Sequence, residues 1–301
     1  RDGERRLAVV RALPMPPLAP HVVVSAGTLV YGDGRDVHVL RGLSGAMDDL
    51  RLRLGWGFKV HALAERGGVV FVGGAGRREF LGICDLREPR PTFAPVPLPD
   101  EATRLGKGID GFALHGDLLV AVDDILMPRY LLVYDIAEPR APRCLRCAPF
   151  PWSLTAEHVV AVASAGDLMA VLSTYANHGF MGVAVHLVEL PSLHLRASLS
   201  AGQPGSFRRV EGPALDLSGV ALVGRTLYLA GRKSGLGTLD LTPFLDERPA
   251  PKDPPRIPPE ALRWTPFPDG PVEAVLTAGA DVIPVVRGPT GLHGEPWRPD
   301  A

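Results

Sequence analysis

Residues 111–147 hold the pattern that decides the fold, and they read GFALHGDLLVAVDDILMPRYLLVYDIAEPRAPRCLRC. Short apolar runs rich in Val, Leu and Tyr alternate in this stretch with turn residues such as Gly, Asp and Pro. Runs of this length that are bounded by turn signals indicate β-strands. The stretch therefore predicts a meander of four short strands, the last of them over residues 143–149.

The same order of strands and turns recurs along the chain. Further copies lie over residues 61–91, 160–191 and 219–243, and partial copies lie at 19–39 and 273–286. Four copies end their third strand with an acidic residue that a Pro-containing turn follows, and we expect this carboxylate to accept hydrogen bonds from the turn. These acids are Asp85, Asp135, Glu189 and Asp240, which are 50, 54 and 51 residues apart.

A repeat of this period in an all-β chain is typical of a β-propeller. The 301 residues hold about six such units, and 34 Gly and 31 Pro exclude a large helical bundle. We predict one domain over residues 1–301, a six-bladed β-propeller, with a seven-bladed ring as the alternative. The apolar run at residues 6–13 is expected to complete the last sheet and close the ring. The Pro-rich stretch 249–259 is expected to be a long loop or an irregular outer strand.

Two resemblances to known families follow from these residues. Residues 130–142, YLLVYDIAEPRAP, resemble an LVIVD-type propeller repeat, and residues 83–91 form a weaker copy. This resemblance implies a propeller and no common chemistry. Asp110-Gly111 and Glu211-Gly212-Pro213 are similar to motifs of the gluconolactonase and luciferin-regenerating family, whose members are six-bladed, metal-dependent hydrolases. The metal-binding Asn positions of that family have no counterpart in this chain.

Polar and ionisable residues stand at or near the starts of the predicted innermost strands. In a propeller these strands line the central channel, so we expect their side chains to converge at one mouth of it. The expected binding residues are His21, Lys59, His61, Asp110, His158, Asp216 and Glu273. The candidate ligands of a divalent cation are the carboxylates of Asp110, Asp216, Glu273 and Glu211. A histidine there could act as a general base, although polar channel mouths also occur in propellers that bind nothing.

Charge and hydropathy exclude other classes of function. The 32 Lys+Arg balance 33 Asp+Glu, and no basic stretch suggests a nucleic-acid partner. Arg greatly outnumbers Lys, which is typical of a GC-rich bacterial genome. The longest apolar stretch, residues 159–173, contains Asp167 and is too short to cross a membrane.

The leading functional hypothesis is therefore a non-catalytic propeller that binds another protein or domain. Binding of a small ligand at the channel mouth is a further possibility. The alternative is a metal-dependent hydrolase of the lactonase type that uses the acids at the mouth. No cofactor is expected beyond the possible divalent cation.

Cys144 and Cys147 form a Cys-Leu-Arg-Cys motif, which suggests redox chemistry or zinc binding. Residues three positions apart in a regular strand point to opposite faces of the sheet. The predicted strand would therefore separate the two thiols, and a zinc site would need further Cys or His ligands nearby. We expect no function for this motif.

Overall fold

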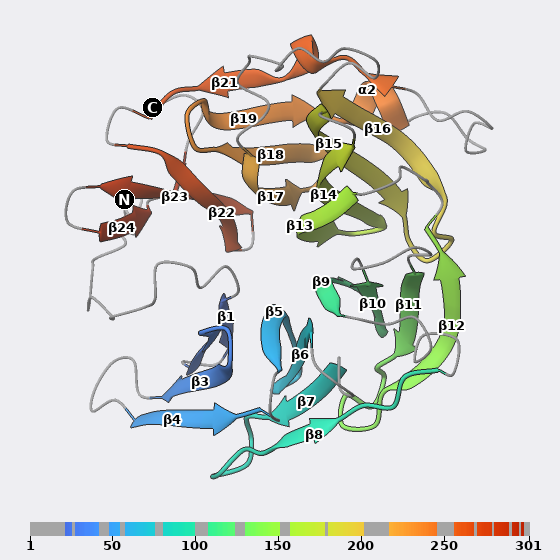
Figure 1. Ribbon diagram of the computed structural model, residues 1–301, viewed down its shortest axis with the longest axis vertical. Helices are drawn as coiled ribbons and strands as arrows, with labels where there is room; N and C mark the ends of the chain where they lie inside the picture. The colour runs from blue at the N-terminus through green and yellow to red at the C-terminus, as the bar shows by residue number, and fades with distance from the viewer. Residues whose placement is uncertain are drawn as a thin grey trace, which may run out of the picture.

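Six β-sheets follow one another along the chain and lie around a common centre (Figure 1). The first sheet comprises β1 (Val22–Ser25), β2 (Thr28–Gly32), β3 (Asp36–Arg41) and β4 (Asp48–Arg53). The second comprises β5 (Lys59–Arg66), β6 (Val69–Ala75), β7 (Leu81–Asp85) and β8 (Phe93–Pro95). The third comprises β9 (Ile109–His115), β10 (Leu118–Asp123), β11 (Tyr130–Asp135) and β12 (Arg143–Pro149). The fourth comprises β13 (Glu157–Ala165), β14 (Leu168–Asn177), β15 (Phe180–Glu189), β16 (Leu195–Ala201) and β20 (Arg256–Ile257). The fifth comprises β17 (Leu217–Val223), β18 (Thr226–Gly231), β19 (Gly235–Asp240) and β21 (Arg263–Thr265). The sixth comprises β22 (Val272–Ala278), β23 (Asp281–Gly288) and β24 (Gly291–Gly294).

The computed structural model describes most of the chain. The described residues are 22–25, 28–41, 48–54, 58–75, 81–99, 108–123, 130–150, 157–177, 180–201, 217–245, 256–267, 270–278, 280–288, 291–294 and 296–297. Within these ranges, the only helices are the short α2 (Thr242–Leu245) and a single 3-10 turn, η2 (Pro259–Ala261). None of the helices described is long and apolar enough to span a membrane.

The all-β class and the repeated antiparallel meander are confirmed, and the predicted strand over residues 143–149 is β12. The predicted closing strand, residues 6–13, lies outside the described residues. Part of the Pro-rich stretch 249–259 does form an outer strand, because β20 pairs in parallel with β16 of the preceding sheet. The chain then returns to the fifth sheet as β21, which pairs with β19.

Apolar side chains fill the spaces between neighbouring sheets. Between the second and third sheets, for example, Phe71 and Leu81 pack in one cluster with Leu119, Leu132 and Tyr134, and all five are at most 1% exposed. Burying a side chain of this size stabilises the fold by about 1.5–3 kcal/mol. The alternation of apolar residues in each strand therefore supplies the contacts that join one sheet to the next.

Glycine begins four of the tight turns that join the first two strands of a sheet. The backbone φ angles are 57° at Gly67, 54° at Gly116, 57° at Gly166 and 56° at Gly224. This left-handed region strains residues that carry a Cβ atom. The recurrent glycine of the sequence repeat is thus explained by backbone geometry.

Three of the four acids that end the third strands accept a backbone hydrogen bond from the turn that follows, as predicted, and the fourth does not. Asp85, Asp135 and Asp240 each accept a hydrogen bond from the backbone amide two residues later, at 2.9, 3.0 and 2.9 Å. Glu189 instead accepts a hydrogen bond from the hydroxyl of Ser192 at 2.9 Å. These four carboxylates are therefore structural groups.

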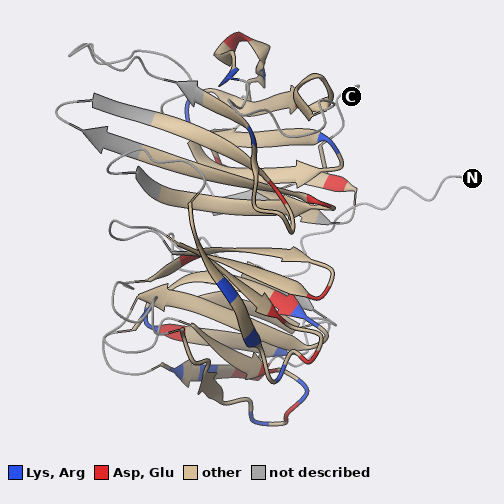
Figure 2. Ribbon diagram, turned by 90° about the vertical axis from the view of Figure 1, so that its right-hand side faces the viewer, with Lys and Arg blue, Asp and Glu red and all other residues tan. Residues whose placement is uncertain are grey.

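Arginines connect several pairs of neighbouring sheets. The Arg41 guanidinium donates to the carbonyl oxygens of Leu86 and Pro89, at 2.8 and 3.0 Å. Across the next interface the direction is reversed, because Arg140 lies in the turn after β11 and pairs with Asp85, the last residue of β7 in the preceding sheet. The side view in Figure 2 shows strands that are largely uncharged along their length, with many charged residues near strand ends and turns. The planar guanidinium suits this role because its several donors reach more than one acceptor.

Both cysteines of the Cys-Leu-Arg-Cys motif lie on the same face of β12, so the expectation that the strand separates them is wrong. Cys144 is opposite Tyr134 and Cys147 is opposite Leu132, two positions that share a face of β11. The register shifts between Val133 and Tyr134, because β12 contains one extra residue there. A β-bulge of this kind reverses the alternation of side chains beyond it.

We predict that Asp85→Asn lowers the free energy of unfolding at pH 7 by about 2 kcal/mol. Arg87 and Arg140 donate to this 8% exposed carboxylate and lower its pKa to about 2. Because the folded pKa is depressed, the stabilisation is present above pH 4 and is lost as the pH falls toward 2. Urea denaturation at pH 7, 4 and 2 measures both effects.

Asp117→Asn is the matched control for that experiment. Asp117 also pairs with an arginine of a neighbouring sheet, Arg66 at 2.7 Å, but its side chain is 62% exposed. Exposed ion pairs contribute at most about 1 kcal/mol. An equal loss of stability in the two variants at pH 7 would contradict the assignment of Asp85 as a buried link between sheets.

Candidate functional site

Five inner strands carry a β-bulge at the same register. In β5, β9, β13, β17 and β22 the pairing with the second strand is regular for five residue pairs from the turn, and one residue is then left unpaired. The unpaired residues are His61, Asp110, Val160, Ser218 and Glu273. Bulges re-aim side chains and are frequent beside functional sites. We call the end of the inner strands where they lie the bulge face.

A small residue follows each bulge and permits the next inner strand to approach. These residues are Ala62, Gly111, Ala161, Gly219 and Ala274. A Cβ atom on Gly111 would overlap the Val162 side chain of β13. A Cβ atom on Gly219 would lie 3.4 Å from the Ala274 Cα of β22, which is ordinary van der Waals contact. The bulged residues are thus held on strands that pack closely against one another.

His61 and Asp110 are brought together by two neighbouring bulges. The Nδ1 atom of His61 lies 2.5 Å from Oδ1 of Asp110, and the two side chains are 31% and 13% exposed. The other carboxylate oxygen, Oδ2, is buried and has no hydrogen-bond partner among the described residues. A buried acceptor without a partner normally indicates a missing donor, ion or water. The pair orients the imidazole and leaves Nε2 as its second polar atom.

Glu273 is engaged by two arginines. Its carboxylate oxygens lie 3.2 Å from Nε of Arg232 and 2.8 Å from Nε of Arg287, and the side chain is 18% exposed. Each guanidinium already neutralises part of the negative charge of the Glu273 carboxylate, which a metal ion would need for binding. Glu273 is therefore better suited to holding the β18–β19 turn and β23 than to binding a metal.

The remaining predicted site residues are described only in part. Lys59 is exposed at the start of β5, and His158 lies in β13 opposite Thr174, with its side chain outside the described part. His21, Asp216 and Glu211 lie outside the described residues altogether. Within the described part of the chain, no three His, Cys, Asp or Glu side chains gather in a way that could hold a metal ion.

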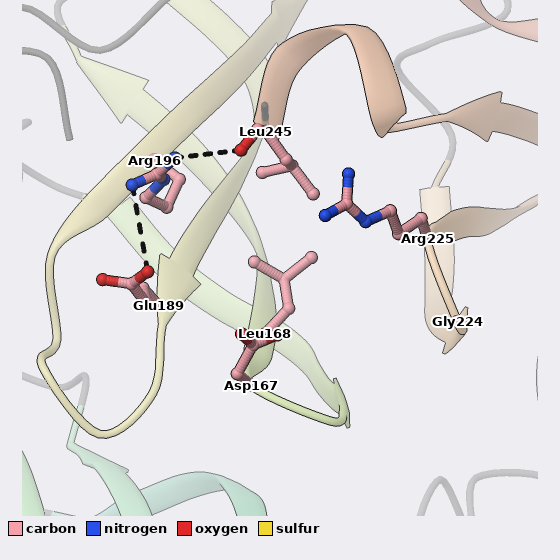
Figure 3. Close-up of a pocket in the computed structure, with 7 residues that line it drawn as sticks. All are labelled: Asp167, Leu168, Glu189, Arg196, Gly224, Arg225 and Leu245. Atoms are coloured by element: carbon pink, nitrogen blue, oxygen red, sulfur yellow. Dashed lines mark hydrogen bonds and ion pairs between the residues drawn. The ribbon is translucent and has the colours of Figure 1, made fainter. Parts of the chain in front are cut away.

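Two hollows that the sequence did not predict lie away from these residues. A small one of about 50 Å³ lies between the fourth and fifth sheets, where Arg196 donates to the Leu245 carbonyl at 3.0 Å and approaches Glu189 at 3.8 Å (Figure 3). A larger one of about 500 Å³ is lined in part by Tyr228 and Trp297. Both are formed by segments distant in sequence, so no local motif could have indicated them.

Comparison with known proteins supports the fold and nothing finer. No protein-family model matches the chain, and no curated protein matches it. A computationally designed protein, Ika8, is similar in structure with a TM-score of 0.52 and 14% identity, over 92% of this chain and 70% of Ika8. Apo AztD from Citrobacter koseri has a TM-score of 0.51 and 13% identity, over 91% of this chain and 84% of AztD. At such low identity the likeness concerns the propeller-like arrangement of sheets alone.

The packing of the inner strands predicts different effects on stability when two glycines at the same register are replaced by alanine. Gly111→Ala forces an overlap with Val162, so we expect a loss of about 1–3 kcal/mol in the free energy of unfolding. Gly219→Ala meets only ordinary contact, so a change within about 0.5 kcal/mol is expected. Urea denaturation of both variants tests this. Equal losses would show that neighbouring inner strands do not approach as described.

Proposed function

We propose that this chain is a six-bladed β-propeller, closed by residues 6–13, that binds a partner protein through its bulge face. The observation that carries the proposal is the common register of the five bulges, which sets one end of the sheets apart from the other. The LVIVD-type resemblance of residues 130–142 supports the propeller. The last described sheet has three strands, which leaves a place beside β24 for the N-terminal strand.

Contacts between sheets occupy many polar groups at the end opposite the bulge face. Arg66 pairs with Asp117 at 2.7 Å, and Nδ1 of His115 lies 2.6 Å from the Gly166 carbonyl oxygen. Arg41 spans the outer part of the first interface at the same end. These polar groups are already engaged in contacts between sheets, which leaves fewer of them for a partner.

Two of the longer intervals between strands lie at the bulge face, whereas a third, residues 241–255, follows β19 at the other end. The strands that flank residues 100–107 and 202–216 end and begin there, whereas the first two strands of each sheet are joined at the other end by turns of two residues. Loops on a rigid scaffold are the usual carriers of recognition. Exposed Lys59 and half-buried His61 give this face polar groups for a protein partner.

Photo-crosslinking tests this proposal. A benzophenone amino acid at Lys59 is expected to capture one defined protein in cells of the source organism, and the same group at Arg90, exposed in the turn after β7, is expected to capture none. The purified partner should then bind Lys59→Glu at least tenfold more weakly and Arg90→Glu unchanged. Equal capture from both positions, or capture from Arg90 alone, would refute the bulge face as the binding face.

A metal-dependent hydrolase of the lactonase type is the second candidate, and one observation favours it. Asp110 presents a buried, unpartnered Oδ2 atom beside His61, whose Nδ1 is fixed by the same carboxylate. A divalent cation at Oδ2 would polarise a substrate carbonyl, and Nε2 of His61 would take a proton from water. The resemblance of Asp110-Gly111 to the gluconolactonase family points in the same direction.

Melting curves in EDTA and in added Ca²⁺, Mg²⁺, Mn²⁺ or Zn²⁺ test this candidate. If it holds, one ion raises Tm by several degrees, Asp110→Asn removes the shift, and lactone hydrolysis depends on the same ion. Asp117→Asn is the control and should keep the shift. Hydrolysis that persists in Asp110→Asn, or no shift with any ion, would count against the hydrolase.

A further inference from the structure

The bulge in β12 converts a spaced pair of cysteines into neighbours on one face of the sheet. Cys144 and Cys147 occupy the positions opposite Tyr134 and Leu132, and both pack against the apolar cluster between the second and third sheets. The Sγ atom of Cys144 lies 3.7 Å from the carbonyl oxygen of Arg146, the residue that precedes Cys147. The Cys144 side chain therefore leans along the strand toward its partner.

The two thiols are partly exposed to solvent, and a hydroxyl group without a described hydrogen-bond partner lies near them. Both cysteines are half-buried, so small solutes can reach them. The Tyr134 hydroxyl is buried without a hydrogen-bond partner among the described residues. Tyr134 lies opposite Cys144 in the strand pairing and belongs to the apolar cluster against which both cysteines pack. A negatively charged sulfur would accept the hydrogen bond that this hydroxyl lacks.

The separation of the two cysteines suits a bridging ion better than a direct bond. Two positions of a strand span about 6.8 Å, and side chains on one face stand nearly parallel. Their Cβ atoms are thus farther apart than the about 4.5 Å at which disulfides form. At the metal–sulfur distance of about 2.3 Å known for zinc thiolates, a bridging ion holds two sulfurs up to about 4.6 Å apart.

We propose that Cys144 and Cys147 form a two-thiolate site for a soft monovalent cation of the Cu(I) type. Thiolates select such ions, whereas zinc takes four ligands, and no third Cys, His, Asp or Glu joins the pair in the described residues. Binding exchanges two thiol protons for one cation, and the metal keeps its oxidation state. The bound thiolates then receive the Tyr134 hydrogen bond. The proposal is independent of the bulge face.

Competition with bathocuproine disulfonate tests the site on the reduced, full-length chain under anaerobic conditions. We expect one Cu(I) per chain, with at least a 100-fold loss of affinity in Cys144→Ser and in Cys147→Ser. Cys84→Ser is the control, because Cys84 is 1% exposed and burial raises the pKa of its thiol to about 12. Its affinity for Cu(I) should match that of the unmodified chain.

Tyr134→Phe tests whether the Tyr134 hydroxyl contributes to Cu(I) binding by the two cysteines. This substitution keeps the ring in the core and removes an unsatisfied hydroxyl, so stability should be unchanged or higher. Loss of the hydrogen bond to a ligand should lower Cu(I) affinity about tenfold. Unaltered binding in either single cysteine variant, or ready formation of a Cys144–Cys147 disulfide with no Cu(I) binding, would overturn the proposal.

Discussion

The close approach of neighbouring inner strands is the constraint on which the rest of the structure depends. Six sheets around one centre must crowd their first strands, and a chain with uniformly large side chains could not be packed there. The small residues that follow the bulges, such as Gly111 against Val162, remove that crowding. The wider spaces farther out are then filled by Phe71, Leu119 and similar side chains. Small residues near the centre and large ones outside are two consequences of one geometry.

Polar contacts between sheets fix the relative position of sheets that apolar packing holds together. The apolar contact between sheets has no direction and would tolerate sliding, whereas Arg41 on the Leu86 carbonyl or Arg140 on Asp85 fixes how one sheet sits on the next. Arg suits these links between sheets better than Lys would. An ammonium is a compact point charge and lacks the planar fork that holds two acceptors at once.

Sequence patterns within a few residues were enough to predict most of the fold. Alternating apolar runs, glycine turns such as Gly116, and acids such as Asp135 act within a few residues, so the sequence alone predicted the meander and the turn-holding role of the acids. The pairing of His61 with Asp110 was not predicted, although both residues were named. It depends on two bulges in different sheets, and nothing in an apolar run shows where one residue is left unpaired. The return of the chain as β20 against β16 is likewise a long-range contact.

The motif at Cys144 and Cys147 shows why such features matter for function. A regular strand would place these thiols on opposite faces, so the spacing argued against a shared site, and one extra residue reversed that conclusion. The same physical device places His61 beside Asp110 at the other edge of the sheets. In both cases one residue of the strand is left unpaired, and a side chain then lies on a face of the sheet that regular alternation would not give it. In this chain, therefore, candidate chemistry should be sought where the pairing register shifts, because regular strands place their side chains by packing alone.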